Sequence, residues 1–143
     1  MLPTLLALAL LAASACAGPR PVEVVAAVLV AEAGGERDAV RSMRAVREVI
    51  QTRAGQQRRS EVAVVTARLQ FSCLNGTTPA QLVARARQHP RWPAALELAR
   101  APVPVASVGQ ADHYHALTVR PVWASGQRPV AVVGNHAFFR LHP

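Results

Sequence analysis

The sequence contains no lysine, only two cysteines and six aromatic residues, and it has no long apolar run. The absence of lysine indicates a coding bias rather than a mechanism. Because no apolar stretch approaches the roughly 18 residues of a membrane span, the sequence excludes an integral membrane protein. Its 143 residues are 51% hydrophobic and 17% charged, which predicts one folded domain instead of a disordered chain.

The first 19 residues carry no charged side chain and predict an export signal. An apolar core from Leu5 to Ala13 precedes small residues that suit cleavage at Ala15 or Ala17, although the usual basic start is missing. We therefore expect residues 1–17 to be a signal peptide and residues 22–143 to be the exported domain, in the periplasm, the cell envelope or the medium. A buried N-terminal helix is the alternative.

Cys16 offers a second way to process this leader. Cleavage before Cys16 would end a lipoprotein signal and leave a lipid anchor on this residue, whereas cleavage after Ala17 leaves Cys73 as the only cysteine. In both cases the mature chain has no intramolecular disulfide, so packing must hold its core.

The charge of the chain is strongly positive, with 16 arginines against 8 acidic residues and a net charge of +8. An exported domain of this charge is expected to bind anionic polymers of the envelope, and an ordinary solvated surface is the alternative. No nucleic-acid-binding motif accompanies the arginines, so we expect no nucleic acid partner.

Hydrophobic spacing and capping residues predict helices in the first two thirds of the chain and strands in the last third. The helices are expected at residues 21–33, 38–54, 60–68, 78–89 and 93–100, with Gly55 ending the second. A strand is expected over residues 112–119, and a hairpin over 130–133 and 136–141 around Gly134-Asn135. The fold class is therefore α+β, a helical N-terminal part followed by a small antiparallel β-sheet.

Glu32 is the first candidate for chemistry. It lies three and four residues after Leu29 and Val28, on the same helix face as these aliphatic side chains. A carboxyl group that loses hydration there favours its protonated form, which is what a general acid for glycosidic bond cleavage requires. The alternative is a solvent-exposed glutamate before the glycines that end the helix, and by residue type alone this is the commoner case.

Two histidines at alternate positions, His113 and His115, share one face of the expected strand, and His136 could join them from the hairpin. Three imidazoles can form a zinc site with one open position. Because the spacing matches no familiar zinc motif, we expect no metal and favour histidines that line a polar groove or bond within the sheet. For Cys73 we favour a buried structural thiol over a nucleophile.

Several short motifs, in order, resemble the SleB/CwlJ-type cell wall hydrolase family of spore cortex-lytic enzymes. The motifs span nearly all of residues 25–140, and their order is more specific than any one alone. They are Glu32-Ala33-Gly34-Gly35-Glu36, Val49-Ile50-Gln51-Thr52-Arg53, Gln70-Phe71-Ser72-Cys73, Ala111-Asp112-His113-Tyr114-His115-Ala116, Pro121-Val122-Trp123-Ala124 and Gly134-Asn135-His136-Ala137-Phe138-Phe139-Arg140.

The resemblance implies a peptidoglycan-cleaving catalytic domain related to lysozyme-like enzymes and lytic transglycosylases, with Glu32 as the catalytic acid and base. It implies cleavage of the bond between N-acetylmuramic acid and N-acetylglucosamine in glycan strands, without a cofactor or a metal. The residues expected to bind the substrate are Glu36, Gln70, Phe71, Ser72, His113, Tyr114, His115, Trp123, His136 and Phe139.

The sequence departs from the family pattern at three positions, where Gly34, Thr52 and Asp112 replace the usual arginine, asparagine and threonine. Together with Glu36, Asp112 keeps open a muramidase that uses water, whose inverting form needs carboxyl groups roughly 6.5–9.5 Å apart. An N-acetylmuramoyl-L-alanine amidase with a metal at the histidines is a further alternative. A non-catalytic basic module that binds the cell wall is the alternative from another class.

Overall fold

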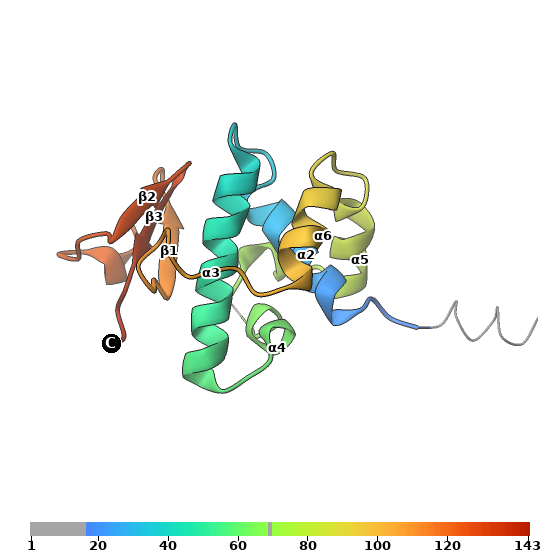
Figure 1. Cartoon of the computed structure of the whole chain (residues 1–143), viewed down its shortest axis with the longest axis horizontal. Coiled ribbons are helices and arrows are strands. Elements are labelled where there is room, and N and C mark those ends of the chain that lie inside the picture. Colours follow the sequence, from blue (N-terminus) through green and yellow to red (C-terminus); the bar gives the residue numbers. More distant parts are fainter. Residues whose placement is uncertain (1–16, 69) are drawn as a thin grey trace, which may run out of the picture.

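The computed structural model describes residues 17–143 except residue 69; most of the expected signal peptide, residues 1–16, lies outside the described residues. The helical part comes first in the chain and the sheet last, so the predicted α+β class is confirmed (Figure 1). The helices are α2 (Pro21–Ala33), α3 (Ala39–Gln57), α4 (Glu61–Val65), α5 (Pro79–Ala86) and α6 (Trp92–Arg100), with short 3-10 turns η1 (Ser72–Leu74) and η2 (Val122–Ala124). The strands are β1 (His113–Ala116), β2 (Ala131–Val133) and β3 (His136–Phe139).

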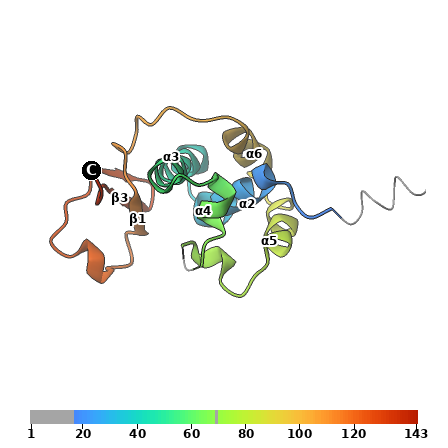
Figure 2. The same ribbon diagram turned by 90° about the horizontal axis from the view of Figure 1, so that it is seen from below.

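Helix α2 is the centre of the helical part, and α3, α4, α5 and α6 all pack around it (Figure 2). Its nearly continuous apolar sequence accounts for this position, because a helix that is apolar on all sides must be enclosed by others. Val28 and Leu29 are fully buried, and each such side chain contributes about 1.5–3 kcal/mol of burial free energy. Within the described part of the chain, no helix has the length and hydropathy needed to span a membrane.

Helix α3 separates the helical core from the sheet (Figure 1). Met43 and Ile50 pack into the helical core, whereas Val49 packs against Phe138 of β3. The predicted end at Gly55 is wrong, because α3 continues through this glycine to Gln57. A glycine inside a helix costs only about 1 kcal/mol, and here Arg58, with a φ of 51°, ends the helix instead.

The sheet has the order β1-β3-β2 and is antiparallel throughout. Gly134-Asn135 forms the predicted turn between β2 and β3, but β1 is shorter than predicted because the chain turns after Ala116. Tyr114 lies opposite Phe138, and Ala116 lies opposite His136. Since opposed residues share a face, these side chains point towards α3, while His113 and His115 point away from it.

The connector between α6 and β1 is held by Glu48, a fully buried carboxylate on α3. Its oxygens accept hydrogen bonds from the backbone N–H groups of Ala106, Ser107 and Val108 at 3.1–3.3 Å and from the Ser107 hydroxyl at 2.5 Å. These bonds satisfy donors of an irregular segment that has no other secondary structure to pair with. Glu48 thereby fixes the path by which the chain leaves the helices and enters the sheet.

Glu23, in the first turn of α2, gives the fold a defined response to acid. Arg87 donates to its Oε1 at 2.5 Å and the Arg20 N–H donates to its Oε2 at 3.0 Å, and these bonds lower the pKa of Glu23 from 4.5 to about 2. The unfolded chain takes up this proton near pH 4.5 and the folded chain only near pH 2. The stabilisation of the folded state by the ionised Glu23 carboxylate is therefore complete above pH 4.5 and is lost as the pH falls towards 2.

We expect Glu23→Gln to melt at a lower temperature than the wild type at pH 7, with the difference shrinking between pH 4.5 and pH 2. Thermal unfolding followed by circular dichroism across this range measures it. Glu97→Gln is the control, because Glu97 is exposed and pairs with Arg100 in the same helix. A difference that stays constant down to pH 2 would contradict the assignment.

Candidate active site

A groove of about 500 Å³ lies between the C-terminal end of α2 and the end of the sheet where β1 and β3 meet the turns. Both glutamates of the Glu32–Glu36 motif line it, so the structure brings together two residues that the sequence singled out. The lining residues are Ala31, Glu32, Ala33, Gly35, Glu36, Ala116, Leu117, Thr118, Asn135 and His136.

Glu32 lies in the last turn of α2 and is half-buried. Its Oε2 accepts a hydrogen bond of 2.7 Å from the hydroxyl group of Tyr114 on β1. Burial and the negative charge of Glu32 raise the pKa of Tyr114 well above its usual value. The hydroxyl group therefore stays protonated and is the donor of this hydrogen bond. The bond fixes the position of Oε2 beside the groove.

Tyr114 is held in place by aromatic rings on several sides. Its ring centroid lies 6.5 Å from Phe71, 5.5 Å from Phe138 and 5.3 Å from His136. Phe71 is buried in the helical core and packs beside Tyr114. It does not line the groove, where it was expected to bind the substrate. The tyrosine is therefore a rigid link between the sheet and the end of α2.

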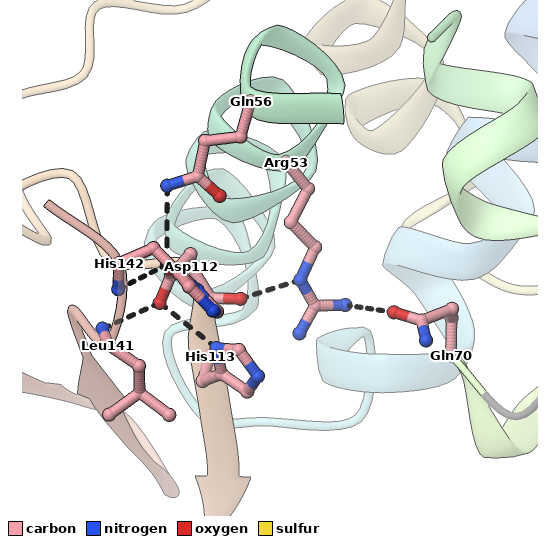
Figure 3. Close-up of polar contacts among 7 residues, drawn as sticks. All are labelled: Arg53, Gln56, Gln70, Asp112, His113, Leu141 and His142. Carbon is pink, nitrogen blue, oxygen red and sulfur yellow. Dashed lines mark hydrogen bonds and ion pairs between the residues drawn. The ribbon is translucent and has the colours of Figure 1, made fainter. Parts of the chain in front are cut away.

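Arg53 is a buried cation close to this pair; it belongs to the motif at residues 49–53 but was not among the residues expected to bind the substrate. Its Nε donates to the backbone oxygen of Asp112 at 2.6 Å (Figure 3). Its guanidinium lies 5.5 Å from the centroid of the Phe71 ring. Burial lowers the pKa of Arg53, whereas Tyr114, Asp112 and Glu32 act to raise it. A signal was present, because Arg53 follows Ile50 by three residues and so lies on the apolar stripe of α3.

Glu36 accepts hydrogen bonds at one of its two carboxyl oxygens. Oε2 accepts from the Ser42 hydroxyl at 2.5 Å and from the Asn135 N–H at 3.1 Å, and Oε1 lies 2.8 Å from Nδ1 of His136. Gly134 is needed for this approach, because its φ is +55° and a Cβ atom there would lie 1.9 Å from Glu36 Oε2. These contacts tie the β2–β3 turn to the start of α3 beside the groove.

The residues of the motif at positions 70–73 differ in their exposure to solvent. Gln70 is exposed and its Oε1 accepts from Arg53 at 3.5 Å, while Ser72 is exposed at the start of η1. Burial, followed by the negative charge of Glu32, raises the pKa of Cys73 to about 12. Its thiolate is therefore rare at neutral pH, in agreement with the expected structural thiol and not with a nucleophile.

The remaining aromatic and histidine candidates lie on the face of the sheet that points away from α3. His115 stacks on Phe139 at 5.2 Å, and Trp123 lies beside both His113 and Phe139, at 5.2 and 5.3 Å. The hypothesis that His136 joins His113 and His115 is wrong, because strand alternation places His136 on the opposite face. The three imidazoles do not converge on one site.

Asp112, just before β1, is the hub of a polar network (Figure 3). Only 1% of the residue is exposed, and it accepts hydrogen bonds from the backbone N–H groups of Leu141 and His142, both at 2.9 Å, and from Gln56 at 3.2 Å. Burial alone would raise the pKa of Asp112, but these bonds and those from His113 and His142 hold it well below its usual range.

Comparison with known proteins identifies the family of this chain. The profile of a family described as Cell Wall Hydrolase matches residues 37–139, well over half of the chain. The chain belongs to this family. The matched span begins directly after Glu36, so it covers Tyr114, Arg53 and the sheet but not Glu32 itself.

The fold of this cell wall hydrolase is similar to that of the catalytic domain of the Bacillus cereus SleB protein. The likeness has a TM-score of 0.58 at 19% sequence identity and covers 84% of this chain and 89% of that one. It confirms the fold expected from the resemblance to the SleB/CwlJ-type family. No curated protein sequence matches the chain.

Proposed function

We propose that this cell wall hydrolase is a lytic transglycosylase that cleaves the bond between N-acetylmuramic acid and N-acetylglucosamine in peptidoglycan strands. The observation that carries the proposal is the half-buried Glu32 carboxyl, which lines the groove with one oxygen held by Tyr114. A carboxyl group oriented in this way can transfer a proton from its other oxygen to a bound glycan.

The reaction needs only one carboxyl group. Protonated Glu32 gives its proton to the glycosidic oxygen, the bond to the muramic C1 breaks, and the N-acetylglucosamine end leaves with a free hydroxyl group. The Glu32 carboxylate then takes the proton from the muramic 6-hydroxyl, whose oxygen bonds to C1 and closes a 1,6-anhydro ring. Glu32 ends the cycle protonated, and no water is consumed. While Glu32 is ionised, the positive charge of Arg53 stabilises its carboxylate.

The state of the other carboxylates supports this mechanism over a muramidase that uses water. Asp112 is buried under five donors, so it would have to give up hydrogen bonds to activate a water molecule, and Oε2 of Glu36 is held by Ser42 and Asn135. A muramidase with Glu36 as its base is the second candidate, because Glu36 lines the same groove as Glu32.

Export and wall binding belong to the same proposal. Residues 1–17 act as the signal peptide, or the leader ends before Cys16 and leaves a lipid anchor, and residues 22–143 act as the catalytic domain at the cell envelope. The net charge of +8 supports binding to anionic wall polymers.

Mass spectrometry of the soluble products from purified peptidoglycan tests the proposal. We expect muramyl ends in the anhydro form, each lighter than a hydrolysed end by one water molecule. Ordinary reducing ends would favour the muramidase, and stem peptides released from intact glycan would favour the amidase. A folded protein that binds the wall in a salt-sensitive manner and releases nothing would favour a non-catalytic module.

A further inference from the structure

Asp112, His113 and His142 form a cluster outside the groove, where the start of β1 meets the segment that follows β3 (Figure 3). One potential ligand atom from each residue lies within 4.8 Å of the other two. Nδ1 of His113 is 3.0 Å from Oδ1 of Asp112, and Nδ1 of His142 is 2.8 Å from Oδ2. Each imidazole therefore faces a different oxygen of the same carboxylate.

These distances match neighbouring ligands of a metal ion. With metal–nitrogen and metal–oxygen bonds of about 2.0–2.2 Å, two ligands at a right angle are about 2.9 Å apart. The same distances are those of the hydrogen bonds that the two Nδ1 atoms make to Asp112, so binding an ion requires each proton to move to Nε2. Nitrogen and oxygen ligands in tetragonal geometry are typical of Cu²⁺ and Ni²⁺, and Cu²⁺ binds such sites most tightly.

We propose that Asp112, His113 and His142 form a binding site for a divalent transition-metal ion, with Cu²⁺ bound more tightly than Ni²⁺ or Zn²⁺. Each neutral imidazole binds through Nδ1 and carries its proton on Nε2. The site is independent of the proposed glycan cleavage, because His113 points to the face of the sheet away from Glu32 and α3.

The surroundings of the cluster fit this role. The Asp112 carboxylate is oriented from behind by the N–H groups of Leu141 and His142 and by Gln56, as outer-shell donors orient metal ligands. The His142 side chain is 67% exposed, which gives an ion a path to the carboxylate. A bound ion would link the end of the chain to β1 and so stabilise the folded state.

Trp123 provides a local readout, since its ring lies 5.2 Å from that of His113. In the untagged Trp92→Phe variant Trp123 is the only tryptophan, and its fluorescence is titrated with CuCl2 and with NiCl2. We expect saturable quenching that EDTA reverses and a stoichiometry of one Cu²⁺ per chain by calorimetry. His113→Gln and His142→Gln should each weaken Cu²⁺ binding by about ten-fold or more.

His115→Gln is the matched control. His115 lies on the same strand face and 5.6 Å from Trp123, but its Nδ1 is paired with the Ala116 oxygen and it is not part of the cluster. This variant should bind Cu²⁺ as tightly as its parent. Circular dichroism shows whether each variant is folded, and the exposed position of His142 makes His142→Gln the variant that disturbs the fold least. Quenching without saturation, or equal binding in the His113→Gln/His142→Gln double variant, would overturn the proposal.

Discussion

Glu32→Gln is expected to lower peptidoglycan-cleaving activity by about a thousand-fold or more while the protein remains folded. Glutamine has nearly the same shape and still offers an oxygen to the Tyr114 hydroxyl, but it cannot give or take a proton. General acid and base catalysis each contribute about 10²–10⁴ in rate, and in the proposed mechanism one residue supplies both. Loss of turbidity of a peptidoglycan suspension measures the activity, and thermal unfolding checks the fold.

Glu36→Gln is the control on the same groove, and it should cost less activity because Glu36 holds the β2–β3 turn through its contacts with Ser42 and Asn135. Tyr114→Phe removes only the hydroxyl bond to Glu32 and should leave a measurable fraction of the activity. A Glu32→Gln protein with near-wild-type turnover would refute the assignment. Equal losses in Glu32→Gln and Glu36→Gln would instead mean that the two residues share the chemistry.

Glu48→Ala should have the largest effect on stability, a loss of about 3–5 kcal/mol. The substitution leaves three backbone N–H groups of the 106–108 segment without their acceptor, and it opens a cavity beside α3. Since the free energy of unfolding of a domain is typically only about 5–15 kcal/mol, this loss would remove a large share of it. Urea unfolding followed by circular dichroism measures the change.

Two further variants separate this role from a general effect of removing charge. Glu48→Gln keeps one acceptor oxygen and should fall between the wild type and Glu48→Ala. Glu97→Ala removes a glutamate whose side chain is 69% exposed and should change stability by less than about 0.5 kcal/mol. A loss below about 1 kcal/mol in Glu48→Ala would mean that the connector is held by other contacts.

Local signals predicted the elements of the fold well. Pro21 opening α2, Thr78-Pro79 opening α5 and Gly134-Asn135 in the hairpin all act through the backbone of a few residues, so they can be read without knowing the fold. The end of α3 and the end of β1 were misjudged, because tertiary packing and a later turn decide them.

The candidate site was predicted in part. Glu32 and Glu36 belong to one motif, and Tyr114 was selected from another, but their meeting depends on how the sheet docks against α3. The network around Asp112 could not be foreseen, since His142 follows no motif and reaches Asp112 only through the path of the chain after β3. Contacts between distant segments carry no local pattern in the sequence.

The bond between Tyr114 and Glu32 joins residues 82 positions apart. A contact of this sequence separation closes a long loop, which costs conformational entropy. The acid and the tyrosine that orients it therefore meet only when the last third of the protein has folded onto the first. A chain that lacks its last third therefore carries Glu32 without the tyrosine that orients it, so the proposed site requires the whole domain.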